Sequence, residues 1–261
     1  MRWKTWAACA AIAALASITQ AATIVDYNLT GLTTTAPTTT PATTVAAGVT
    51  ADPLSRGPGI NPAGLTNGFS SDNWTNVAAD TGTIDKARAI SMGDFYQWAI
   101  TVDATHTVSL SGFDTNLRRS AVDAPMNFEL QYSFDNFATA GTTAAQFMYL
   151  GRSSGTAPGT VTPFQWMTTD TPGQGNGNAI QQQNLSSVAG LQNIAPGSTV
   201  AFRLYAWGSG SANAANSNTV ALGRTQGPLL SGTITEVVVP EPASLTLCLV
   251  GAIAAWSLRR R

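Results

Sequence analysis

The chain has 261 residues, of which 10% are charged, and its formal net charge is −1. Between residues 23 and 239, eight Lys and Arg stand against thirteen Asp and Glu, and this net charge of about −5 argues against nucleic acid as a partner. Soluble proteins usually carry ~25% charged residues, and their helices need a charged face. This chain has few charges but is rich in Thr, Ser, Ala, Asn and Gly, and strands can use Thr, Ser and Asn on their polar face, so the composition favours strands.

The first residues have the pattern of an export signal. Arg2 and Lys4 form a basic start, residues 6–18 are apolar, and Ala21 and Ala22 supply the small residues that signal peptidase requires. We expect cleavage after Ala22, with Ala21 as the alternative site. Residues 1–22 are therefore predicted to be a signal helix that signal peptidase removes.

The two cysteines lie inside the terminal segments of the chain. Cys9 falls in the apolar start and Cys248 in an apolar run near the end, so residues 23–239 contain none. No disulfide is available to this region. A chain of this length buries enough apolar surface to fold without one, and we expect a single domain.

The first part of this domain combines a strand with an unusual loop. Residues 22–29 are predicted to form an edge strand. Residues 33–44 contain eight Thr, two Ala and two Pro, and such a segment neither buries a core nor alternates as a strand does. It is predicted to be an extended, solvated loop, and an O-glycosylated stalk is the alternative.

The central region alternates with the period of two residues that is typical of strands with one buried face. Residues 96–102 form one such strand, residues 103–106 a turn, and residues 107–111 a second strand, so a hairpin is predicted. The alternation changes phase at Gly112, which indicates a β-bulge.

Further strands follow, separated by loops rich in Gly, Asn and Pro. The clearest alternation spans 128–134 and ends in a turn at Asp135 and Asn136. Many short strands without helical periodicity predict an all-β domain over residues 23–239, a two-sheet β-sandwich of jelly-roll-like topology. The later strands are expected at residues 146–150, 199–207 and 232–239.

Alternation along 199–207 indicates a candidate sugar-binding surface. Arg203, Tyr205 and Trp207 share the face opposite to the core, where aromatic rings can stack on a pyranose and Arg can bind hydroxyls or uronic acids. Trp74 and Trp166, in loop-like segments, are candidates to join them. The alternative is a structural patch, in which Arg203 packs on the rings or a second layer covers them.

Catalytic and metal-binding patterns are weak. The single histidine, His106, falls in a predicted turn, which argues against a histidine-based metal site or triad. The acids have no distinctive spacing, although two of them could form a glycosidase pair. We expect no catalytic residues and no cofactor; one structural calcium ion held by loop Asp and Asn residues, with ligands that the sequence does not identify, remains an open alternative.

The last 22 residues have the order of a sorting signal. Pro240, Glu241 and Pro242 precede an apolar run over residues 243–258, and Arg259, Arg260 and Arg261 follow as a cytoplasmic stop. As a helix, the run would span ~24 Å, less than a hydrocarbon core of ~30 Å, so its flanks must snorkel or the bilayer must thin.

This tail resembles the PEP-CTERM sorting signal of exported bacterial proteins. The resemblance implies a transient transmembrane helix and recognition by an exosortase-type membrane protease at residues 240–242. The same tail signature is also used to label ice-binding proteins, but the body of this chain lacks regular Thr-x-Thr ladders. The body is similar to domains that precede such tails, at residues 27–32, 113–120, 133–137 and 200–208.

These observations favour a non-enzymatic function. We expect the protein to cross the inner membrane, to be anchored transiently by its C-terminal helix, and then to reach the outer surface or the medium. There it would be a component of the cell envelope or of an extracellular polysaccharide matrix. The first alternative is a lectin similar to carbohydrate-binding modules, and the second is a glycoside hydrolase or lyase.

Overall fold

The computed structural model describes residues 21–33, 37–74, 86–120, 124–125, 127–150, 164–169, 178–180, 182–208, 219–224 and 226–237. Within these ranges the chain forms strands and loops, apart from α1 (Lys86–Met92) and the 3-10 helix η1 (Ala189–Leu191). The predicted all-β class is confirmed. No helix in the described ranges has both the length and the apolar character to cross a membrane.

The described strands form three sheets. The first contains, in spatial order, β14 (Gln183–Asn184), β8 (His106–Asp114), β17 (Leu229–Glu236), β1 (Ala22–Asp26) and β2 (Thr44–Val45). The second contains β12 (Phe164–Thr169), β11 (Thr142–Leu150), β10 (Asn127–Ser133), β15 (Thr199–Trp207), β7 (Phe95–Val102) and β3 (Val49–Ala51), with β4 (Ser55–Arg56) also on β7. The third contains β13 (Asn178–Ala179), β9 (Asn116–Arg119), β16 (Val220–Leu222), β6 (Phe69–Asp72) and β5 (Asn61–Ala63). Neighbouring strands are antiparallel, except that β12 runs parallel to β11.

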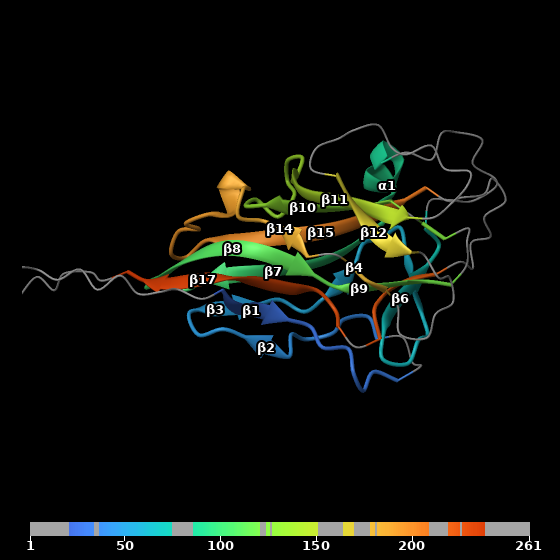
Figure 1. Cartoon of the computed structure of the whole chain (residues 1–261), viewed down its shortest axis with the longest axis horizontal. Coiled ribbons are helices and arrows are strands. Elements are labelled where there is room, and N and C mark those ends of the chain that lie inside the picture. Colours follow the sequence, from blue (N-terminus) through green and yellow to red (C-terminus); the bar gives the residue numbers. More distant parts are fainter. Residues whose placement is uncertain are drawn as a thin grey trace, which may run out of the picture.

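The first and third sheets together form one layer. β9 follows β8 along the chain, β16 precedes β17 and β13 precedes β14, and the neighbour order is the same in both sheets. The seven-stranded sheet packs on this layer. Trp98 of β7 stacks on Phe113 of β8 at 6.0 Å, and the Tyr96 hydroxyl donates to the Val220 carbonyl of β16 at 2.7 Å. The arrangement is sandwich-like, with α1 on the far side of β10 and β11 from β8 and β17 (Figure 1).

Aromatic residues fill the space between the layers. Trp98 stacks on Phe202 at 5.6 Å as well as on Phe113, and Phe128 stacks on Phe147 at 5.5 Å. All five rings are at most 1% exposed. These rings come from both layers, so their burial holds the layers together.

The predicted hairpin at residues 96–111 is wrong. β7 pairs with β15, β3 and β4, whereas β8 pairs with β17 and β14 in the opposite layer. The turn after Val102 therefore connects two facing sheets, and His106 is the first residue of β8. The alternation of residues shows which face of each strand is buried, but not which strand lies beside it. Apolar faces can meet by lying side by side in one sheet or by packing across the core.

Other strand predictions are confirmed. β15 has the predicted bounds, and β10 begins one residue before the predicted strand at 128–134. The predicted bulge is present, because Gly112 pairs with Ser231 and Leu110 with Gly232, which leaves Ser111 as the extra residue. The strand predicted at residues 22–29 forms as the shorter β1, but the edge position is wrong, because β17 pairs with one side of β1 and the two-residue β2 with the other.

The Thr-rich segment is attached to the domain over its described residues. Thr40 is 4% exposed, and its backbone exchanges hydrogen bonds of 2.9 and 2.8 Å with Leu54. The Arg56 side chain donates to the Pro37 carbonyl at 2.6 Å, and the Thr43 hydroxyl donates to the Asp26 carbonyl at 2.9 Å. Residues 37–44 are mostly exposed, as predicted for a solvated loop, but they are not a detached stalk, because backbone groups at several points find partners in the sandwich.

Candidate functional site

Mostly polar side chains form two rows across the outer face of the seven-stranded sheet. The register aligns residues of β7, β15, β10 and β11, so that side chains on the face away from the core lie next to each other. One row contains Gln97, Arg203, Gln131 and Thr143, and the next contains Phe95, Tyr205, Glu129 and Gln146.

Glu129 is a buried carboxylate at the centre of this face. It is 0% exposed, and Lys86 at the start of α1 places its Nζ 2.7 Å from Oε1. Gln131 Nε2 and the Thr143 hydroxyl donate to the same oxygen at 2.6 and 2.9 Å, and Gln146 Nε2 donates to Oε2. A buried charge is stable only when it is paired and hydrogen-bonded, and these four donors meet that requirement.

Arg203 lies between two aromatic rings. Its guanidinium carbon is 4.1 Å from the ring centre of Phe95 and 4.1 Å from that of Phe137. Its Nε donates to Gln97 Oε1 at 2.7 Å, and its Nη1 is 3.4 Å from the Tyr205 hydroxyl. The two rings and the Gln97 hydrogen bond fix the plane of the guanidinium.

The loop after β10 places Phe137 over Arg203. Asn136 and Phe137 both have positive φ, 55° and 62°, which is unusual for a bulky aromatic residue. The turn is held by Ser133, whose hydroxyl donates to Asp135 Oδ1 at 2.5 Å and accepts from the Phe137 amide at 2.9 Å. Hydrogen bonds to Asp135, that from Ser133 first, lower the pKa of its carboxyl.

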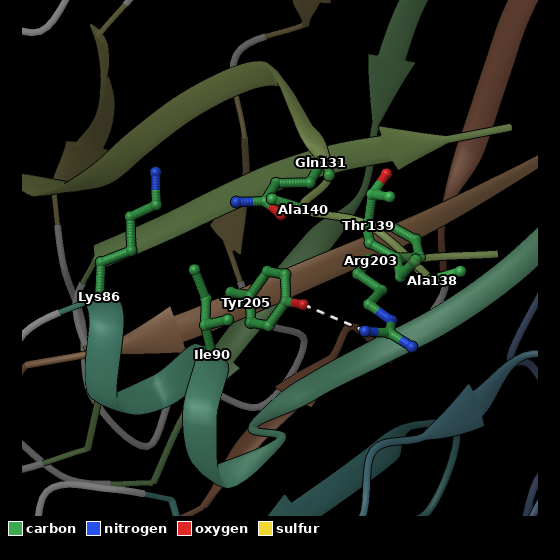
Figure 2. A pocket seen from close by; sticks show the side chains of 10 residues that line it. Lys86, Ile90, Gln131, Ala138, Thr139, Ala140, Arg203 and Tyr205 are labelled. Carbon is green, nitrogen blue, oxygen red and sulfur yellow. Dashed lines mark hydrogen bonds between the residues drawn. The ribbon is translucent and has the colours of Figure 1, made fainter. Parts of the chain in front are cut away.

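These elements enclose a cleft of about 450 Å³ between α1, the sheet and the loop (Figure 2). Lys86 lies at one end, Arg203 and Ala138 lie at the other, and Tyr205 lies between them (Figure 2). This volume is within the ~300–1,000 Å³ that is typical of small-molecule sites. The lining residues are Lys86, Ile90, Gln131, Phe137, Ala138, Thr139, Ala140, Gly141, Arg203 and Tyr205.

The structure brings together two of the three predicted sugar-binding residues. Arg203 and Tyr205 both line the cleft, on the face predicted from the alternation. Tyr205 is only 2% exposed, because Phe95 packs edge-on against it at 5.3 Å and α1 lies over β15, so its ring is not an open plate. Trp207, at the end of β15, is half-buried and does not line the cleft.

The other predicted candidates lie elsewhere. Trp74 is 0% exposed and its Nε1 donates to the Ser71 carbonyl at 2.8 Å, so it belongs to the core and not to a sugar-binding surface. Trp166 is on β12, and its side chain is outside the described structure. His106 Nδ1 lies 2.7 Å from Asp103 Oδ1, and neither residue lines the cleft.

Several predictions fall outside the described residues. These include the sorting motif Pro240, Glu241 and Pro242, the arginines at 259–261 and the signal segment up to residue 20. Ala22 is the first residue of β1, and Ala21 precedes it. Among the described residues, no group of three or more His, Cys, Asp or Glu is arranged to hold a metal ion.

Sequence reasoning missed most of the cleft. Glu129 and Gln131 alternate with buried Phe128 and Leu130, so the face argument used for residues 199–207 would also have found them. No sequence signal identifies Lys86 or Phe137, because their positions depend on how α1 and the loop fold onto the sheet. A scan against protein-family models and a search of curated proteins both find no match for this chain.

Proposed function

We propose that the chain is an exported, non-enzymatic protein of the cell envelope or of an extracellular polysaccharide matrix. Signal peptidase removes residues 1–22, residues 243–258 anchor the protein transiently in the inner membrane, and an exosortase-type membrane protease acts at residues 240–242. The protein then reaches the outer surface or the medium.

The order of the tail carries this proposal. Pro240, Glu241 and Pro242, an apolar run and three arginines follow one another without interruption. The end of the sandwich supports the same assignment. β17 pairs with β8 up to Glu236, and the Val237 amide donates to the Thr105 carbonyl at 2.7 Å. The motif therefore begins three residues after the last described backbone contact of the domain.

The proposal includes a jelly-roll-like topology for the sandwich. Along the chain, strands change layer repeatedly, from β7 to β8, from β9 to β10, from β14 to β15 and from β15 to β16. Such crossings between two antiparallel layers support this topology, which is a double-sheet fold of eight strands in two Greek keys.

The cleft favours binding over hydrolysis. A glycosidase needs two carboxyl groups about 5–9.5 Å apart on either side of the scissile bond. Glu129, whose carboxylate pairs with the lining residue Lys86, is buried and accepts from four donors, and the described lining residues include no Asp or Glu. A lectin similar to carbohydrate-binding modules is therefore the second candidate function, with the hydrolase or lyase after it.

The sorting step can be tested directly. Replacing Pro240, Glu241 and Pro242 by alanine should leave the protein exported but retained in the membrane at full length. The matched control replaces Val237, Val238 and Val239 by alanine, which alters the same number of adjacent residues and should leave processing unchanged. Fractionation with mass spectrometry of the C-terminus measures both outcomes. Normal processing of the first variant would refute the assignment.

A further inference from the structure

We propose that the cleft between α1, β15 and the loop after β10 binds a carboxylate-bearing sugar, such as a hexuronic acid unit of a polysaccharide. Arg203 would hold the carboxylate, and the apolar lining would contact the ring. This inference rests on the proposed matrix function and names the class of ligand that the protein would take there.

The charge balance of the cleft points to an anion. Lys86 and Arg203 line it, and Glu129 offsets Lys86 through their 2.7 Å contact. The described partners of Arg203 are all uncharged: Gln97, Tyr205 and two aromatic rings. A partly buried guanidinium is stabilised best by a carboxylate or phosphate, and no described residue supplies one. The charge of Arg203 is therefore available to bind an anionic ligand, although residues 23–239 as a whole carry a net negative charge.

The backbone around Phe137 indicates that this geometry is imposed by the fold. Two consecutive residues, Asn136 and Phe137, have positive φ, and strain of this kind persists where the surrounding structure enforces it, often at ligand sites. Gly141 permits the close approach of the loop, because a Cβ there would lie 2.4 Å from the Phe137 ring and 2.8 Å from Gln131 Oε1. The chain thus holds an aromatic ring over Arg203 before any ligand arrives.

The remaining lining suits a sugar better than a simple anion. Ile90, Ala138 and Ala140 offer apolar surface, and Tyr205 and Thr139 add two hydroxyls to the lining. The Thr139 hydroxyl donates to Asp135 Oδ2 at 2.6 Å, so toward a ligand it would act as an acceptor. A pyranose has both apolar C–H faces and hydroxyl edges, and small-molecule sites typically combine an apolar wall with a few polar groups. A carboxylate on the ring would complete the match with Arg203.

The test uses the full-length chain, purified in mild detergent, and isothermal titration calorimetry. The probes are tri-galacturonate, its fully methyl-esterified counterpart, which has the same rings without charge, and a tri-glutamate peptide, which has the charge without the rings. We expect tri-galacturonate to bind about 10- to 100-fold more tightly than either of the others, as expected for a charge-assisted hydrogen bond.

Two substitutions at an exposed position test the site with little risk to the fold. Ala138 is exposed beside the Arg203 end of the cleft. Ala138→Glu should weaken tri-galacturonate binding at least tenfold, whereas Ala138→Lys should preserve or strengthen it. Arg203→Gln should abolish the preference for the acid over its ester. Arg88→Gln changes the net charge equally from an exposed position on α1 and should bind as the wild type does.

The outcomes separate this inference from the proposed function. Absence of binding to tri-galacturonate, equal binding of acid and ester, equal binding of the peptide, or an Ala138→Glu variant with unchanged affinity would each overturn the sugar assignment. None of these results affects sorting at residues 240–242. Conversely, normal processing of the triple-alanine variant would remove the sorting proposal and leave the binding measurements unaffected.

Discussion

Replacing Arg56 by methionine should lower the free energy of unfolding by about 2–4 kcal/mol. This side chain connects the Thr-rich segment to the sandwich. Its Nε donates to the Ser71 hydroxyl at 2.7 Å, Nη1 to the Pro37 carbonyl at 2.6 Å and Nη2 to the Ser70 carbonyl at 2.7 Å. Its guanidinium also stacks on the Phe69 ring at 3.6 Å.

The magnitude follows from these contacts. A hydrogen bond from a charged donor contributes ~1.5–3 kcal/mol, so three give roughly 5–9 kcal/mol as an upper bound. Three effects reduce the net loss. Methionine keeps part of the contact with Phe69, and water can reach some of the freed acceptors at this partly buried site. In addition, the uncharged methionine avoids the cost of removing a charged guanidinium from water. The same burial lowers the pKa of the Arg56 guanidinium.

Two further variants make the test specific. Arg56→Lys keeps the charge but cannot form the forked contacts, so a loss of about 1–3 kcal/mol is expected. Arg88→Met removes an exposed arginine and should cost less than ~1 kcal/mol. Urea unfolding measures the free energies, and limited proteolysis should detect cleavage within residues 37–44 in the Arg56 variants alone. An Arg56→Lys variant as stable as the wild type, with no new cleavage, would refute the argument.

Two other predictions concern the outer sheet face and acid stability. Tyr205→Ala should cost ~3–5 kcal/mol in denaturant unfolding because the ring is buried, and half-buried Trp207→Ala should cost clearly less; equal losses would contradict the packing described. Hydrogen bonds to Asp103, chiefly from His106, lower the pKa of its carboxyl, so their stabilising effect is present above pH ~4 and is lost as the pH falls through the folded value. The Asp103→Asn variant should therefore show a flatter decline in melting temperature between about pH 4 and pH 2, and a curve parallel to the wild type would exclude this contribution.

The alternation of residues predicted individual strands well but not how they are arranged. It placed β15 with its observed bounds because Val200, Phe202 and Leu204 point to one face and remain buried there. It also predicted the bulge near Gly112, since an extra residue must shift the phase. This pattern does not encode which strands pair. The predicted hairpin around residues 103–105 is therefore wrong, because its two strands belong to facing sheets.

The candidate site shows the same limit. Arg203 and Tyr205 were found because they lie on a strand whose outer face can be read from the sequence. The sequence left open whether Tyr205 is exposed or covered by a second layer, and the structure shows that α1 and Phe95 cover it. Both come from parts of the chain more than a hundred residues away in sequence. Contacts of this kind are set by tertiary packing, which a local pattern does not contain.

The position of β17 between β8 and β1 has a consequence for how the domain forms. β1 begins at Ala22 and β17 ends at Glu236, so the first strand obtains its principal partner only when the last strand has arrived. Until then both β1 and β8 present unpaired edges, which are sites of intermolecular strand pairing. Pairing across such a distance closes slowly because of its entropic cost. A chain interrupted before Leu229 would therefore be left aggregation-prone, and the domain can complete its fold only when nearly its whole length is available.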